Sequence, residues 1–178
     1  SVGKRQIFRG EVLCVELAEP SAFEGTDVAF FSAGASRSRE FAPCAVSAGA
    51  VVIDNSSAFR MDPEVPLVVP EINFDAIKPG TKLVANPNCT AIVLLMAVAP
   101  LRALGKIERI VMSSYQSASG AGAMAMQELI DQTGVVLAGG KAEPKEFQHQ
   151  CAFNVFSHNT QIDESGYNEE ELKVIAES

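Results

Sequence analysis

The chain has 178 residues and a net charge of −8 at pH 7, and 47% of its residues are hydrophobic while 20% are charged. This balance excludes a disordered chain and suffices for a sizeable core, in one domain or in a part of a larger protein. A pI near 4.8 argues against a nucleic-acid partner or an anionic membrane surface.

Two features bear on the compartment. The longest uncharged apolar run of the central helix candidate, Ala91–Ala99, is well short of the roughly 18–20 residues that span a bilayer. No apolar signal segment follows the first residues, Ser1–Arg5. We therefore expect no membrane anchor in this stretch, and a reducing compartment in which cysteines remain free thiols.

Side chains that could bind a metal are scattered along the chain. The cysteines form no C-x-x-C pair and only the two histidines could join them, so the spacing does not predict a zinc site. These residues are Cys14, Cys44, Cys89, Cys151, His149 and His158.

The first part of the chain alternates strand and helix candidates. After a polar loop, residues 11–17 form a short strand candidate, and the apolar run 27–34 is typical of a strand buried on both faces. Residues 38–48 predict a helix that ends at Gly49, and a buried strand follows over 50–54. The short connections imply right-handed crossovers and a parallel sheet.

Residues 55–63 follow the carboxyl end of a predicted strand, which is where open α/β sheets bind their ligands. Arg60 in this segment offers a planar fork that suits a carboxylate or a phosphate, and the alternative is a solvated surface arginine. Further strands are predicted over 67–73 and 81–85.

A turn at Asn86–Asn88 precedes an apolar helix that we expect to run from Cys89 to Leu104. Cys89 therefore falls at or next to the first residue of that helix. Free N–H groups and the helix dipole favour an anion there, so the sulfur is a candidate thiolate nucleophile. The alternative is a small buried hydrophobic side chain, the usual environment of a free cysteine.

The second half begins with a long strand candidate over 107–116, which leads into small residues and a helix over 117–129. Small residues there let a ligand approach the backbone, although a short G-x-G is more often a packing feature. Residues 139–160 predict an irregular segment. Either of its histidines could act as a base, and the alternative is that both are polar loop residues. Residues 168–178 predict an N-capped amphipathic helix.

Five segments, taken in order, resemble aspartate-semialdehyde dehydrogenases, and the resemblance covers nearly the whole chain. The five segments are Phe31–Gly34, Val52–Met61, Val65–Asn73, Asn86–Cys89 and Tyr115–Gly122. Residues 152–159, followed by 166–171, are similar to the plant and algal branch of that family.

The resemblance implies an α/β fold, with part of a Rossmann-type parallel-sheet domain followed by the start of an α+β catalytic and dimerisation domain. Residues 1–88 would be the remainder of the NADP-binding domain and residues 89–178 the N-terminal part of the catalytic domain. The family reduces aspartyl phosphate with NADPH to aspartate semialdehyde, on the route to lysine, threonine, methionine and isoleucine. The resemblance also implies a homodimer or homotetramer in the cytoplasm or the plastid stroma.

The resemblance assigns roles to residues of this chain. Cys89 would be the nucleophile that displaces phosphate and forms an acyl-thioester, while Gln116 helps to hold the substrate beside the sulfur. Arg60 and Asn88 would bind the phosphate, and Glu177 the amino group of the substrate. The residues expected along NADP are Ser1, Ser36, Ser119 and Gly120. No metal is implied.

The glycine-rich G-x-x-G-x-x-G loop of the family and its catalytic histidine are not found in these residues, so we expect the chain alone to be inactive. One alternative is an N-acetyl-γ-glutamyl-phosphate reductase, which shares the thioester mechanism but normally has a tyrosine where Thr90 follows Cys89 here. The other is a truncated, non-catalytic partner of a full-length enzyme, with residues 139–160 as its contact surface.

Overall fold

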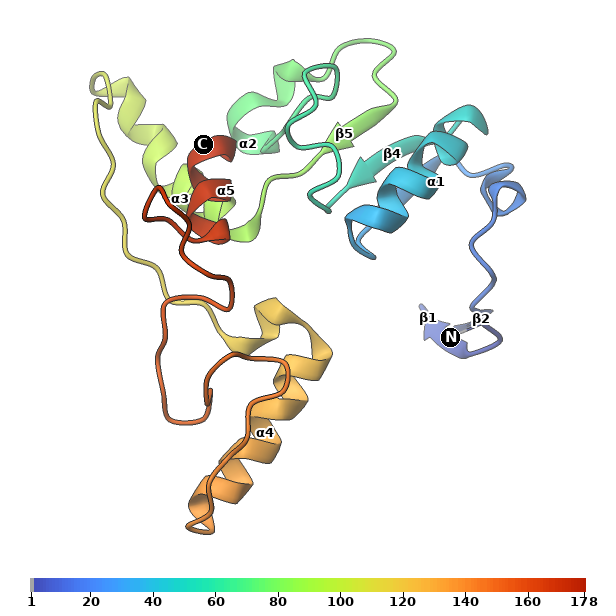
Figure 1. Cartoon of the computed structure of the whole chain (residues 1–178). Helices are drawn as coiled ribbons and strands as arrows, with labels where there is room; N and C mark the ends of the chain where they lie inside the picture. The colour runs from blue at the N-terminus through green and yellow to red at the C-terminus, as the bar shows by residue number, and fades with distance from the viewer. Residues whose placement is uncertain (1) are drawn as a thin grey trace. The chain divides into compact units, whose positions relative to one another are not determined.

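The computed structural model describes residues 2–178, so Ser1, an expected cofactor contact, lies outside the described residues. The chain divides into two compact units (Figure 1). The first unit consists of the residues up to Lys106 together with Val174–Ser178, and the second spans Ile107–Lys173. Each unit is described by itself.

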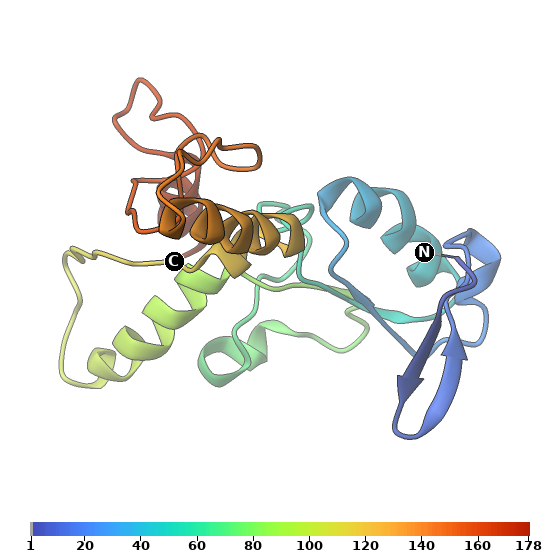
Figure 2. The ribbon, with the colours of Figure 1, turned by 90° about the horizontal axis from the view of Figure 1, so that it is seen from below.

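A three-stranded parallel sheet forms the centre of the first unit. Its strands are β3 (Val28–Phe31), β4 (Val51–Asp54) and β5 (Leu83–Ala85), in the spatial order β3-β4-β5. Helix α1 (Ala35–Ser47) connects β3 to β4 and lies along one face of the sheet (Figure 2). The core between them consists of Ala29, Ala42, Ala45, Ala50 and Val52. The predicted parallel sheet is confirmed.

The prediction that the strand over 27–34 is buried on both faces is wrong. Successive side chains of a strand point to opposite faces, and α1 covers only the face that carries Ala29 and Phe31. Phe30, on the other face, is 76% exposed. The helix after the strand begins at Ala35 rather than Ser38, and Gly49 with φ of 103° follows its end as expected.

The N-terminal stretch, expected to be a polar loop, contains a β-hairpin. Strands β1 (Arg5–Phe8) and β2 (Glu11–Cys14) pair antiparallel through a two-residue turn at Arg9 and Gly10. Both turn residues have positive φ, which two-residue hairpin turns of the primed types require. The 3₁₀ helix η1 (Pro20–Phe23) then leads to β3.

The strand predicted over 67–73 is wrong, because Leu67 forms only a single parallel bridge with Ala85 and a short helix follows. That helix, α2, spans Pro70–Asn73, and η2 spans Phe74–Ala76. Proline is favoured in the first turn of a helix. The Asn73 side chain accepts from the Val69 N–H at 2.9 Å and donates to the Leu67 carbonyl at 3.0 Å, which ends the extended stretch.

Helix α3 spans Cys89–Val98, and the 3₁₀ helix η3 (Ala99–Ala103) continues it. The predicted α-helix to Leu104 is therefore too long. Pro100 has no N–H to donate to the preceding turn, which favours the tighter geometry.

The second unit contains η4 (Ala118–Ala121) and α4 (Ala123–Leu137), and α5 (Glu169–Glu177) continues from it into the last residues of the first unit. Residues 107–116 were predicted as a strand, but they are extended without a β partner among the described residues. Residues 139–160 form no helix or strand, as predicted.

The predicted N-cap of the last helix is confirmed. Asn168 Oδ1 accepts from the Glu171 N–H at 2.9 Å, and the Glu171 carboxylate accepts from the Asn168 N–H at 2.8 Å. This reciprocal pair is a capping box, and it fixes the start of α5 and hence the register that brings Glu177 to its end.

Candidate active site

The turn between β5 and α3 places Cys89 where the sequence predicts it. The Asn88 side chain accepts from the Ala91 N–H at 2.8 Å and caps α3, so Cys89 is the first helical residue. Cys89 is exposed in the structure, which contradicts the alternative of a buried hydrophobic side chain. Its catalytic role stays a prediction.

Arg60 is held in the first unit by contacts to three residues. Its Nε donates to the Asn86 carbonyl at 2.9 Å, its Nη2 to the Asn55 carbonyl at 3.1 Å and its Nη1 to the Glu177 carboxylate at 3.2 Å. The Arg60 side chain is only 9% exposed, so it is not a solvated surface arginine.

The Glu177 carboxylate joins the two residues expected to bind phosphate. Its Oε2 accepts from the backbone N–H of Asn88 at 2.6 Å and from the Asn88 side-chain amide at 2.8 Å, while Oε1 faces Arg60. The structure thus brings Arg60, Asn88 and Glu177 together immediately before Cys89. The N–H donors of Arg60 and Asn88 would suit a phosphate, but in this structure they bind the Glu177 carboxylate. An anionic ligand bound to the same donors would therefore compete with Glu177.

A row of polar side chains follows the strand ends of the sheet. Asn55 after β4 accepts from the Asn86 amide at 2.7 Å and donates to the Ser32 hydroxyl, after β3, at 3.4 Å. Open parallel sheets bind nucleotides at this edge, and hydroxyl and amide groups suit the ribose and carboxamide of a nicotinamide cofactor. Sequence reasoning placed ligands at this edge but did not single out Asn55 or Asn86.

Two features of α1 also fit a nucleotide at this edge of the sheet. Gly34 precedes the helix with φ of 93°, and Ser36 is exposed in its first turn. A helix N-terminus with free N–H groups favours phosphate. Ser36 therefore remains a candidate cofactor contact.

Gln116, Ser119 and Gly120 belong to the second unit. A Cβ added to Gly120 would lie 1.9 Å from Nε2 of Gln116, so only glycine leaves room for this amide. The Ser119 hydroxyl hydrogen-bonds that of Ser117 at 2.7 Å. The predicted substrate residue Gln116 is thus positioned against a predicted cofactor residue.

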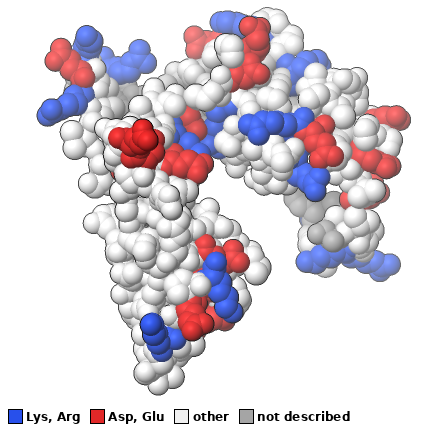
Figure 3. Space-filling view, in the orientation of Figure 1, with Lys and Arg blue, Asp and Glu red and all other residues white. Residues whose placement is uncertain are grey.

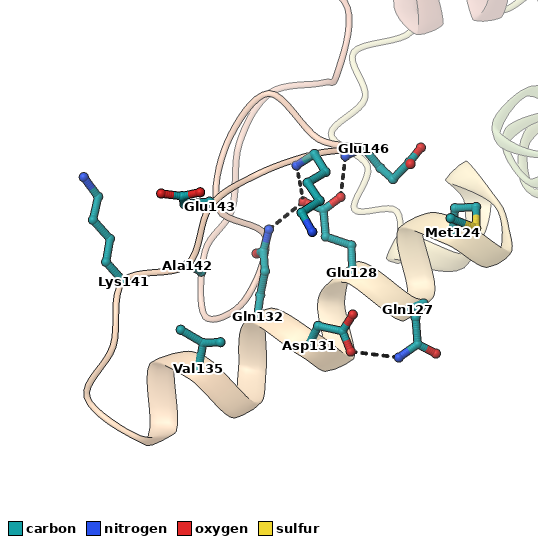
Figure 4. Close-up of a pocket in the computed structure, with 11 residues that line it drawn as sticks. Met124, Gln127, Glu128, Asp131, Gln132, Val135, Lys141, Ala142, Glu143 and Glu146 are labelled. Carbon is teal, nitrogen blue, oxygen red and sulfur yellow. Dashed lines mark hydrogen bonds between the residues drawn. The ribbon is translucent and has the colours of Figure 1, made fainter.

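A separate hollow of about 420 Å³ lies along α4 in the second unit (Figure 4). Burial alone would raise the pKa of Glu128, but backbone N–H groups of residues 145–147 and the Gln132 amide hold it below its ordinary value. Gln132 in turn accepts from the N–H of Cys151 at 2.7 Å, so the two side chains fasten the irregular segment to α4. None of the predicted site residues lines this hollow.

Acidic and basic side chains are interspersed on the face shown in Figure 3. Among residues 2–178, no helix combines the length and the apolar character needed to cross a bilayer.

Two family models match the chain in succession. Residues 1–79 match the semialdehyde dehydrogenase NAD-binding domain, and residues 98–178 match the semialdehyde dehydrogenase dimerisation domain. Over its full length the chain is 48% identical to an aspartate-semialdehyde dehydrogenase of Synechocystis sp., of which it covers 53%. It is 44% identical to that of Rickettsia conorii, with 99% of this chain and 53% of the relative covered.

The structure is also similar to solved ones. The crystal structure of aspartate semialdehyde dehydrogenase II from Vibrio cholerae matches with a TM-score of 0.94 and 42% identity, covering 99% of this chain and 53% of that chain. The chain thus spans about half the length of the relatives that it matches. These similarities do not favour the N-acetyl-γ-glutamyl-phosphate reductase or the non-catalytic partner. The two matched regions cover most of the chain, and they agree with the structure on a Rossmann-type NAD-binding domain followed by the dimerisation domain of semialdehyde dehydrogenases.

Proposed function

We propose that the gene product carrying this chain is an aspartate-semialdehyde dehydrogenase, which reduces aspartyl phosphate to aspartate semialdehyde and releases phosphate. The observation that carries the proposal is the exposed Cys89 at the first residue of α3, directly after Asn88, which binds Glu177. Similarity to aspartate-semialdehyde dehydrogenases along the whole chain supports the same activity. The product would enter the synthesis of lysine, threonine, methionine and isoleucine.

Cys89 would perform covalent catalysis. Its thiolate sulfur attacks the acyl carbon of aspartyl phosphate, a carbon–sulfur bond forms, and the carbon–oxygen bond to phosphate breaks so that inorganic phosphate leaves. The resulting acyl-thioester is electrophilic enough to accept hydride. When the acyl carbon has been reduced, the carbon–sulfur bond breaks and the sulfur leaves again as thiolate, which frees the aldehyde.

The neighbouring side chains would position the substrate. Arg60 and Asn88 bind the phosphate group, and Glu177 binds the amino group, which requires Glu177 to exchange some of its present contacts for the ligand. Gln116 holds the acyl group against the sulfur. Orientation of this kind supplies several kcal/mol of the rate enhancement in enzymes.

NADP is the proposed cofactor, and when bound it would supply or accept the hydride. Ser1, Ser36, Ser119 and Gly120 are the proposed contacts, and the polar row at the strand ends fits the same ligand. The match of residues 1–79 to an NAD-binding domain supports a nicotinamide cofactor.

The remaining proposals concern the complete protein. The Vibrio cholerae enzyme has been crystallised in complex with ASA, which supports a small-molecule substrate. The dimerisation-domain match supports a homodimer or homotetramer. We further propose the plant and algal branch, a cytoplasmic or plastid location, a domain boundary near residue 88, and inactivity of the 178-residue chain alone.

The test is the phosphate-dependent, NADP-linked oxidation of aspartate semialdehyde by the gene product. Cys89→Ser should lower turnover by about 10³-fold or more, since the serine hydroxyl is a much weaker nucleophile. Cys14→Ser, which changes an exposed cysteine of β2, is the matched control and should keep the wild-type rate. Unchanged turnover in Cys89→Ser would refute the proposed role of the sulfur.

Alkylation of individual cysteines, resolved by peptide mass spectrometry, tests the same thiol without substrate. Cys89 at a helix N-terminus should react with iodoacetamide faster than Cys14. Cys151 should be slowest, because burial and the charge of Glu128 raise the pKa of its thiol. A Cys89 that reacts no faster than Cys14 would argue against an activated sulfur.

A further inference from the structure

Asp54 is a buried acidic residue to which the proposed mechanism gives no role. It is the last residue of β4 and its exposed fraction is 0%. Its Oδ1 accepts from the Ser38 hydroxyl of α1 at 2.7 Å and from the Ser56 N–H at 3.1 Å, and its Oδ2 accepts from the Ser56 hydroxyl at 2.8 Å.

All of these partners are neutral. The ion pairs found among residues 2–178 do not include Asp54. A carboxyl group buried among neutral donors stabilises a fold less than a well-packed apolar side chain of similar volume. The carboxylate does fix the position of Ser56, because one oxygen accepts from its backbone N–H and the other from its hydroxyl.

The contacts of Asp54 continue along the chain toward Arg60. The Ser56 hydroxyl, which donates to Asp54, accepts from the Ala58 N–H at 3.1 Å. Asn55, which lies between Asp54 and Ser56, offers its carbonyl to Nη2 of Arg60 at 3.1 Å and its side-chain oxygen to Asn86 at 2.7 Å. The Asp54 carboxylate therefore holds Ser56, which directly follows the residue whose carbonyl the guanidinium contacts, within the turn that precedes Arg60.

We infer that Asp54 is a positioning residue that orients the Arg60 guanidinium toward an anionic ligand, by fixing the turn over residues 55–58. The inference rests on the proposed function, in which Arg60 binds the phosphate group. Asp54 does not touch the ligand itself. It acts through Ser56 and Asn55.

The substitution Asp54→Asn tests this role with little change of volume. An amide has one acceptor oxygen. Its NH₂ group must therefore face the Ser56 N–H, which breaks that bond, or a serine hydroxyl, which must then accept rather than donate. In the oxidation assay we expect the KM for phosphate to rise about tenfold while kcat falls less, because ligand orientation is loosened. Asp62→Asn is the control, since the Asp62 side chain is exposed and its carboxylate accepts from the Glu64 N–H at 2.9 Å.

A second pair of variants separates positioning from stability. Ser38→Ala removes the link to α1 but leaves the turn, so it should lower Tm without changing the KM for phosphate. Ser56→Ala removes the hydroxyl within the turn and should raise that KM severalfold. If Asp54→Asn fails to fold, the Ser56→Ala result decides. Asp54→Asn and Ser56→Ala variants that lower Tm but leave the KM for phosphate unchanged would overturn the inference.

Protection of Cys89 from iodoacetamide by inorganic phosphate gives a readout independent of turnover. Wild type should be protected, and Asp54→Asn should need about tenfold more phosphate for the same protection. Phosphate could protect Cys89 of the wild type even if the wild type shows no phosphate-dependent oxidation. In that case the proposed function fails, but comparing protection in wild type and Asp54→Asn still tests the role of Asp54. If phosphate protects wild type and Asp54→Asn equally, the inference is wrong.

Discussion

Replacing Glu177 by glutamine should destabilise the first unit because it breaks a buried ion pair. The Glu177 and Arg60 side chains are 4% and 9% exposed. The remaining oxygen of a glutamine can keep both donors of Asn88, but its NH₂ group then faces the guanidinium. Removing one partner of a buried pair costs about 3–5 kcal/mol. Arg60 retains its bonds to two backbone carbonyls, so we expect a loss of about 3 kcal/mol.

Urea unfolding followed by circular dichroism would measure the loss in the free energy of unfolding. The control is Glu169→Gln, which makes the same change at the other end of α5. Glu169 forms an ion pair with Lys173 there, and the two side chains are 57% and 32% exposed. Such surface pairs contribute about 0.5 kcal/mol or less. Equal, small losses in the two variants would refute the view that Glu177 holds Arg60 and Asn88 together.

Two further predictions concern the second unit. Gly120→Ala should displace Gln116, whose Nε2 would lie 1.9 Å from the new Cβ, and should lower kcat/KM by about 10²-fold. The control is Gly134→Ala in α4, where a new Cβ meets nothing within 4 Å, and it should leave activity unchanged. Equal rates in the two variants would contradict the role given to Gly120. The pKa of Glu128 is below its ordinary 4.5, so its contribution to stability is present above pH 4.5 and is lost as pH falls below it. Thermal unfolding of Glu128→Gln should therefore depend less on pH in that acid range than that of wild type, and parallel profiles would contradict this.

The parallel sheet and the position of Cys89 could be predicted because local signals agree with the fold there. Apolar runs of strand length alternate with a helix that ends shortly before Gly49, and Asn88 is a residue type that caps helices. The N-cap at Asn168 could be predicted for the same reason, whereas its reciprocal bond with Glu171 was seen only in the structure. In each case the residues that determine the structure are close in sequence.

Elements that depend on distant partners could not be predicted in this way. Residues 107–116 have a strand pattern, but a strand also needs a neighbour to pair with. Phe30 looked buried because composition does not say how many faces of a sheet are covered. The contacts of Glu177 with Arg60 and Asn88 join residues more than 80 positions apart, and no local pattern indicates that the three meet.

The central claim is that Cys89 carries an acyl group during turnover. The most direct measurement is mass spectrometry of the Cys89 peptide after the gene product has been mixed with aspartate semialdehyde and NADP without phosphate. We predict an acyl adduct on Cys89 that disappears when phosphate is added, and none on Cys14 or Cys151. An enzyme that oxidises the aldehyde while Cys89 remains unmodified would contradict the account.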